Sequence, residues 1–209
     1  RITLLSQLRF SPKAYDVTFI SRVWGGIEHN VRCFETLSRL SGSNILIALF
    51  TPARKNSDPD YERQKIEARK RLEGIGVTCI VGQIPLLKLW RLLAASRIVF
   101  LRAGKHLCIP WRMLDLLGMG SVVVTDSIPY PNWPEPLVQG MHYESINIER
   151  PITTSPAPIE HYSNIEPVID DLLVDKNRRH FIANMASKYF DDHASPRAVG
   201  NYIGQSIQH

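Results

Sequence analysis

The sequence predicts an α/β protein with a doubly wound parallel sheet that is closed by helices at its C-terminal end. Two observations lead to this fold class. Short apolar stretches rich in β-branched residues alternate along the chain with stretches whose apolar residues recur at helical spacing. The short stretches are apolar throughout rather than at every second residue, which is typical of strands that helices cover on both faces of a parallel sheet.

Five strands and four intervening helices follow from this alternation. The strands are expected at residues 16–21, 45–50, 77–81, 98–101 and 122–125. The helices are expected at residues 31–40, 61–73, 85–93 and 111–117. Because proline suits the first turn of a helix and glycine its end, Pro110 and Gly118 mark the start and the end of the last of these helices.

The C-terminal third of the chain has a different pattern. Residues 128–158 are rich in proline, with Trp133 and Tyr143 among the prolines, so we expect an irregular but ordered segment there. Asp175 is expected to cap a helix, and Ser195-Pro196 to open the last one. The closing helices are expected at residues 165–174, 177–190 and 196–207. We expect residues 1–15 to form a linker or lead-in and residues 16–209 to form a single domain.

Length and composition exclude several classes of protein. A chain of 209 residues buries about 70% of its unfolded surface, which is enough for a full core. The 25 Lys and Arg residues are spread among 20 Asp and Glu residues, so nucleic-acid binding is not expected. No apolar run approaches the roughly 20 residues of a membrane-spanning helix. Three separated cysteines form no disulfide framework, which favours a reducing, cytoplasmic location.

Residues able to bind an anion follow the predicted strands, where an open parallel sheet binds its ligands. The loops at these carboxyl ends comprise residues 21–26, 82–84, 102–106 and 125–127. Arg102, Gly104 and Lys105 lead toward the helix that begins at Trp111. Glycine lets a ligand approach the backbone closely, and the free N–H groups of a helix N-terminus add to the Arg and Lys charges. Together these features predict a site for a diphosphate.

Three further residues extend this predicted anion site. Arg112 and Asp115 are three residues apart and share a helix face, so the cation could hold a phosphate and the carboxylate a ribose hydroxyl. The alternative is an ion pair at the surface. Arg22 follows the first strand in a Gly-rich turn and could reach the same anion, and the alternative there is a solvent-exposed arginine.

Other motifs argue against NAD and metal sites. Gly25-Gly26 lacks the third glycine of a dinucleotide-binding fingerprint, and no acidic residue ends the second strand. Asp58-Pro-Asp60 is interpreted as the entry to a helix, and Asp191-Asp192-His193 as part of a turn between two helices. We expect no metal cofactor.

Several segments resemble the nucleotide-sugar half of GT-B glycosyltransferases, and in particular exostosin-like and related bacterial enzymes. In these enzymes an Arg-x-x-Glu helix ends in a small-residue turn before a strand, as residues 110–124 do here with Asp in place of Glu. The segments that carry the resemblance are residues 81–84, 96–104, 110–124, 137–143 and 177–208. Residues 22–28 also resemble the Gly-Gly-x-Glu turn of the other, acceptor-side half. The donor half accounts for more of the chain, and we choose it.

The resemblance implies a Rossmann-like, donor-binding domain and a role for each site residue. Gly82, Gln83 and Ile84 would border the nucleobase, and Asp115 would take the place of the glutamate that faces the ribose. Asp is one methylene shorter than Glu, so the helix would have to lie closer to the ribose. The residues that would hold the diphosphate are Arg22, Gly104, Lys105 and Arg112. No general base can be identified in this chain, and in this architecture it would come from the other domain.

The implied function is that of a glycosyltransferase donor domain acting in polysaccharide biosynthesis. It would bind a nucleotide diphosphate sugar for transfer to a hydroxyl acceptor, together with an N-terminal acceptor domain that this chain lacks. Two alternatives stay open, a sugar-nucleotide epimerase or phosphorylase of the same fold and a non-catalytic sugar-nucleotide-binding module that serves assembly. Peripheral contact with a membrane is a further open point.

Overall fold

A computed structural model gives the arrangement of most of the chain, with only the backbone described at some positions. The described residues are 2–22, 27–40, 43–50, 59–74, 78–82, 84–102, 109–128, 132–133, 135–147 and 159–207. Of the predicted site residues, Gln83, Gly104 and Lys105 lie outside the described residues, and the side chain of Arg22 does as well.

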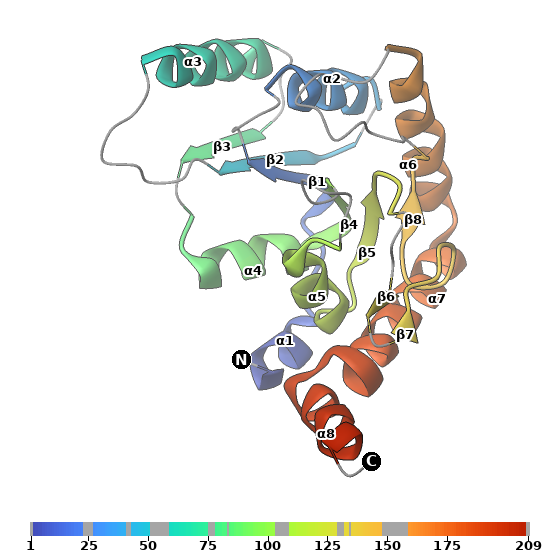
Figure 1. The fold of residues 1–209 in the computed structure, drawn as a ribbon. Coiled ribbons are helices and arrows are strands. Elements are labelled where there is room, and N and C mark those ends of the chain that lie inside the picture. The colour runs from blue at the N-terminus through green and yellow to red at the C-terminus, as the bar shows by residue number, and fades with distance from the viewer. Residues whose placement is uncertain are drawn as a thin grey trace.

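A six-stranded, all-parallel sheet forms the centre of the molecule, in the order β3-β2-β1-β4-β5-β8 (Figure 1). Its strands are β1 (Tyr15–Arg22), β2 (Ile45–Phe50), β3 (Thr78–Gly82), β4 (Ser96–Leu101), β5 (Val122–Thr125) and β8 (Glu144–Ser145). The chain winds outward from β1 in one direction to β3 and then in the other direction from β4, which is the doubly wound arrangement that the sequence predicts. A small antiparallel ribbon pairs β6 (Asn132–Trp133) with β7 (Glu135–Pro136).

Helices cover both faces of this sheet (Figure 1). The first five are α1 (Ile2–Leu8), α2 (Ile27–Leu37), α3 (Pro59–Glu73), α4 (Leu86–Ala94) and α5 (Trp111–Gly118). After β8 follow the 3-10 helix η1 (Ile159–Asn164), α6 (Ile165–Val174), α7 (Lys176–Tyr189), the π-helical turn η2 (Phe190–Ala194) and α8 (Pro196–Ile207). None of the described helices is long and apolar enough to cross a membrane.

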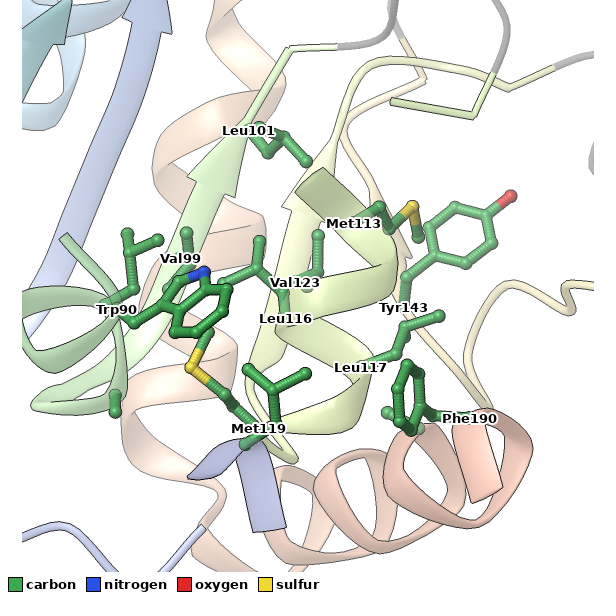
Figure 2. Close-up of a cluster of buried hydrophobic side chains, with 14 of the residues drawn as sticks. Trp90, Val99, Leu101, Met113, Leu116, Leu117, Met119, Val123, Tyr143 and Phe190 are labelled. Carbon is green, nitrogen blue, oxygen red and sulfur yellow. The ribbon is translucent and has the colours of Figure 1, made fainter. Parts of the chain in front are cut away.

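Two hydrophobic clusters, one on each face of the sheet, make up the core. Along β4 the side chains alternate between them: Ile98 and Phe100 belong to the cluster beneath α2 and α6, whereas Val99 and Leu101 belong to the cluster beneath α4 and α5. Figure 2 shows part of the second cluster. All four of these side chains are buried, so the strand is covered on both faces, as its continuous apolar sequence predicts.

Several described elements lie where the sequence pattern predicts none, α1 and β8 among them. Residues 2–8 of the expected lead-in form α1, whose Leu5 and Leu8 are buried in the cluster beneath α4 and α5. The strand β8 lies inside the segment expected to be irregular, and it is polar: its Glu144 is buried and pairs with Arg178 of α7 at 2.5 Å. A strand held by a tertiary ion pair and by backbone pairing leaves no apolar signal in the sequence.

The expected capping residues at the C-terminal end are confirmed. The Asp175 carboxylate accepts a hydrogen bond from the backbone N–H of Arg178 in the first turn of α7, at 2.9 Å. The Ser195 hydroxyl accepts one from the backbone N–H of Ala198 in α8, at 3.2 Å. Each bond satisfies one of the N–H groups that the start of a helix leaves unpaired.

Candidate functional site

The carboxyl ends of the six parallel strands meet at one edge of the sheet, and the backbone positions of two arginines of the predicted anion site lie there. Ile20 of β1 is paired with Leu101 of β4. Arg22 therefore ends β1 two residues beyond this pair, and Arg102 follows one residue beyond it on the neighbouring strand. The edge between β1 and β4 is also the point where the strand order reverses, and doubly wound sheets bind their ligands at this point.

The predicted nucleobase residues lie farther along the same edge. Gly82 ends β3 and is paired with Phe50 of β2. In the strand order, β3 lies three positions from β4, which corresponds to roughly 14 Å at the usual strand spacing. Ile84 is buried and belongs to the hydrophobic cluster that also contains Trp90 and Leu101.

Helix α5 begins at this edge and carries both Arg112 and Asp115. Its N-cap residue is Pro110, which has an extended backbone and makes no side-chain capping bond to the helix. The first turn is closed by a hydrogen bond from the Met113 N–H to the Pro110 carbonyl, at 2.7 Å. Arg112 is half-buried in this turn, and Asp115 is buried one turn later. The start of α5 thus combines helical N–H groups with a cation, as the sequence predicts.

The Asp115 carboxylate has a partner that the sequence does not reveal. The indole N–H of Trp90 on α4 donates a hydrogen bond to Asp115 Oδ2, at 3.2 Å. Both residues are buried, with 5% of Trp90 and 9% of Asp115 exposed. The sequence places Trp90 among the apolar residues of a helix. The only available signal was that a buried indole N–H needs an acceptor, and the sequence does not say which acceptor faces it.

A second group of buried polar residues lies at the carboxyl ends of β4 and β5. Leu101 is paired with Thr125, so Arg102 and Asp126 follow on neighbouring strands, on the face covered by α2. Asp126 is fully buried. Burial lowers the pKa of Arg102, and the negative charge of Asp126 acts in the opposite direction. This edge of the sheet therefore contains a largely buried arginine whose charge is balanced from within the protein.

The thiol of Cys33 on α2 belongs to the same buried group. Its pKa is raised by burial and by the negative charge of Asp126, and the Arg102 charge opposes this rise. Cys33 is fully buried, so a thiol is maintained in its neutral form above this edge.

Among the described residues, no group of three or more His, Cys, Asp and Glu side chains is arranged to hold a metal ion. Asp191, Asp192 and His193 form most of the turn η2 instead, where Asp191 pairs with Arg9 and Asp192 with Lys188. The expectation that no metal is needed stays a prediction.

No protein-family model and no curated protein sequence matches the chain. Solved structures do. HepE of Anabaena in complex with UDP and glucose matches with a TM-score of 0.63 and 12% identity, over 99% of this chain and 51% of its own. The C-terminal domain of the group 1 glycosyltransferase LpcC from Francisella tularensis matches with a TM-score of 0.59 and 15% identity, over 94% of both chains. Sucrose-phosphate synthase from Thermosynechococcus elongatus matches with a TM-score of 0.64 and 11% identity, over 97% of this chain and 50% of its own.

The chain has the fold of the C-terminal half of a GT-B glycosyltransferase. The expected fold class is confirmed, and so is the choice of the C-terminal half, since a solved C-terminal domain matches over nearly its whole length. The chain spans about half the length of HepE and of sucrose-phosphate synthase. At these levels of identity the likeness concerns the fold alone. The roles of the individual site residues therefore stay predictions.

Proposed function

We propose that the chain is the donor domain of a glycosyltransferase, which binds a nucleotide diphosphate sugar for transfer to a hydroxyl acceptor. The observation that carries the proposal is the edge between β1 and β4, where the strand order reverses. There Arg22 ends one strand, and the N-terminus of α5 with Arg112 follows the other. HepE, which shares this fold, was solved with UDP and glucose and also with UDP-glucose.

The diphosphate would be held by positive charge and backbone N–H groups. In glycosyl transfer, negative charge develops on the leaving diphosphate while the anomeric carbon becomes cation-like. Arg22, Lys105, Arg112 and the first N–H groups of α5 would be aimed at that charge, and Gly104 would let the ligand approach the backbone. Each prepositioned donor of this kind is worth on the order of 3 kcal/mol in the transition state. These residues supply the charge from the protein itself, so the proposal includes no metal.

The nucleoside would lie along the edge toward β3. Asp115 would accept hydrogen bonds from the ribose, and Gly82, Gln83 and Ile84 would border the base. The general base that activates the acceptor hydroxyl would come from an N-terminal acceptor domain, because matched proteins such as HepE are about twice as long as this chain. The chain alone would then bind the donor and turn it over poorly. A cytoplasmic role in polysaccharide biosynthesis fits the cysteine pattern and this substrate.

The test is a titration of the chain with UDP, GDP and ADP. Binding is measured by the change in the melting temperature of the chain and by calorimetry. At least one nucleotide should raise the melting temperature at millimolar concentration, and Arg112→Ala should weaken its binding by about 10-fold or more, the effect of one hydrogen bond to a charged group. Arg9→Ala is the matched control, because it removes an equal charge from a partly buried arginine at the other end of the molecule. The proposal is wrong if all three nucleotides leave the melting temperature unchanged.

Arg112→Ala also distinguishes the proposal from a non-catalytic module with a vestigial pocket. In such a module, loss of the Arg112 side chain should leave the affinity for the nucleotide unchanged. Transfer of sugar to an added acceptor, measured once an acceptor domain is supplied, separates the proposal from an epimerase of the same fold.

A further inference from the structure

We propose that Trp90 is a positioning residue for Asp115, and that this pair makes the donor site selective for ribose over nucleosides that lack the ribose hydroxyls. The inference rests on the proposed function and deepens it. It adds to the site a residue from α4, which the sequence motifs of the donor half do not include.

The contact between Trp90 and Asp115 joins the helices that follow β3 and β4. Trp90 lies on α4, which follows β3, and Asp115 lies on α5, which follows β4. The bond from Trp90 Nε1 to Asp115 Oδ2 is 3.2 Å long and is buried. Figure 2 shows the Trp90 ring packed in the hydrophobic cluster with Val99 and Met119. This packing holds the ring in place, so the direction of its N–H is fixed.

The chemistry of the pair explains why a fixed carboxylate matters here. A hydrogen bond to a carboxylate is charge-assisted and directional, so it limits the orientations of the Asp115 side chain. The Asp115 carboxylate is then already oriented when a ribose hydroxyl binds. Binding therefore costs less side-chain entropy. Phe would keep an aromatic ring at this buried position on α4 but would lack the N–H group. The presence of Trp therefore points to use of that group, whether for stability alone or also for the ligand.

The affinities of a Trp90→Phe variant for nucleotides with and without the ribose hydroxyls distinguish these two uses. UDP, GDP and ADP are titrated first, and the tightest of them is compared with its 2′,3′-dideoxy analogue. We expect Trp90→Phe to weaken the ribonucleotide about fivefold, the effect of one ordinary hydrogen bond, and to leave the dideoxy analogue unchanged. Trp90→Tyr keeps an aromatic ring with a donor group and should lose less. It also serves as the second variant if Trp90→Phe does not fold.

Two controls show whether Trp90 acts through Asp115. Tyr189→Phe removes a hydrogen bond from an aromatic side chain on α7 to the Glu135 carbonyl, and it should leave both affinities unchanged. In an Asp115→Ala background, Trp90→Phe should have no further effect on the ribonucleotide. Equal weakening of the ribonucleotide and its dideoxy analogue would show a merely structural role and overturn the inference. Failure of the unaltered chain to bind any of the three nucleotides would instead overturn the proposed function, and this inference with it.

Discussion

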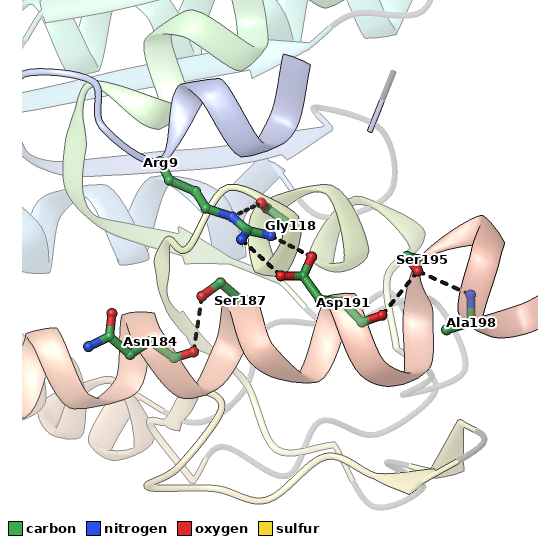
Figure 3. A network of polar contacts seen from close by, with 7 residues as sticks. All are labelled: Arg9, Gly118, Asn184, Ser187, Asp191, Ser195 and Ala198. Atoms are coloured by element: carbon green, nitrogen blue, oxygen red, sulfur yellow. Dashed lines mark hydrogen bonds and ion pairs between the residues drawn. The ribbon is translucent and has the colours of Figure 1, made fainter. Parts of the chain in front are cut away.

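At the carboxyl edge of the sheet, the fully buried Asp126 balances the charge of the largely buried Arg102, whereas at the end where α1 meets η2 an ion pair lies at the surface. There Arg9 donates to Asp191 at 2.7 and 2.9 Å and to the Gly118 carbonyl at 2.8 Å (Figure 3). The Asp191 side chain is 48% exposed. One charged pair is thus enclosed by the protein, and the other fastens three segments together in contact with water.

The difference shows that the two pairs have different uses. An exposed ion pair adds at most about 1 kcal/mol, and its value lies in orienting the segments it joins. A buried pair costs several kcal/mol in desolvation per charge, and apolar residues of similar size would often serve stability equally well. Stability alone therefore gives little reason for an arginine under the carboxyl edge. The four predictions below test this comparison, from the largest effect to the smallest.

Asp126→Asn is expected to have the largest effect, a loss of about 3 kcal/mol in the free energy of unfolding. The variant keeps the shape of the side chain but leaves the Arg102 charge uncompensated in a buried place. Urea denaturation followed by circular dichroism measures the loss. A change below about 1 kcal/mol would mean that removing a charge at the carboxyl edge costs no more stability than removing one from the surface pair at the other end.

How far the sequence predicts this edge depends on strand pairing. The bounds of β2, β5 and α6 agree with the expected ranges, because continuous apolar stretches and helical spacing are local signals. The positions of the loops at the carboxyl ends follow from the same signals. The proximity of Arg102 and Asp126 does not, because it depends on β4 pairing with β5, and the bond between Trp90 and Asp115 depends on how α4 packs beside α5. Only tertiary structure supplies these distances.

Gly118→Ala is expected to cost about 1 to 2 kcal/mol at the end where α1 meets η2. A Cβ atom at this position would lie 3.1 Å from the Phe190 ring and 3.2 Å from Leu5, so the packing of α5 against these residues would have to shift. Gly204→Ala on α8 is the control, because nothing lies within 4 Å of its Cβ, and better helix propensity should stabilise it by up to about 1 kcal/mol. Thermal denaturation of both variants measures the change in stability. The prediction is wrong if both substitutions destabilise the protein or if both stabilise it.

Acidification is expected to weaken the same end by up to about 1 kcal/mol. Burial lowers the pKa of His142, and its Nδ1 accepts a hydrogen bond from the Val138 N–H at 3.0 Å, so the folded state favours the neutral ring. Since the unfolded chain binds this proton more readily, stability is present above about pH 6.5 and is lost as the pH falls below it. Denaturation midpoints between pH 8 and 5 measure the slope.

His142→Asn keeps an acceptor for the Val138 N–H and removes the titrating group, so it should flatten that slope. The exposed His180 on α7 provides the control variant His180→Asn, which should leave the slope as it is in the unaltered chain. If His142→Asn retains the full pH dependence, another group is responsible.

Asp191→Asn is expected to have the smallest effect, about 0.5 kcal/mol, although it removes the ion pair of a carboxylate that accepts two hydrogen bonds from Arg9. Water solvates the released charges, and Arg9 keeps its bond to the Gly118 carbonyl. The difference from the unaltered chain should shrink further in 1 M salt, where exposed charges are screened over about 3 Å. The loss caused by Asp126→Asn should persist in the same salt, because a buried charge is screened much less. Equal salt sensitivity of the two variants would show that both pairs are effectively exposed, and the case for a buried cation beneath the carboxyl edge would fail.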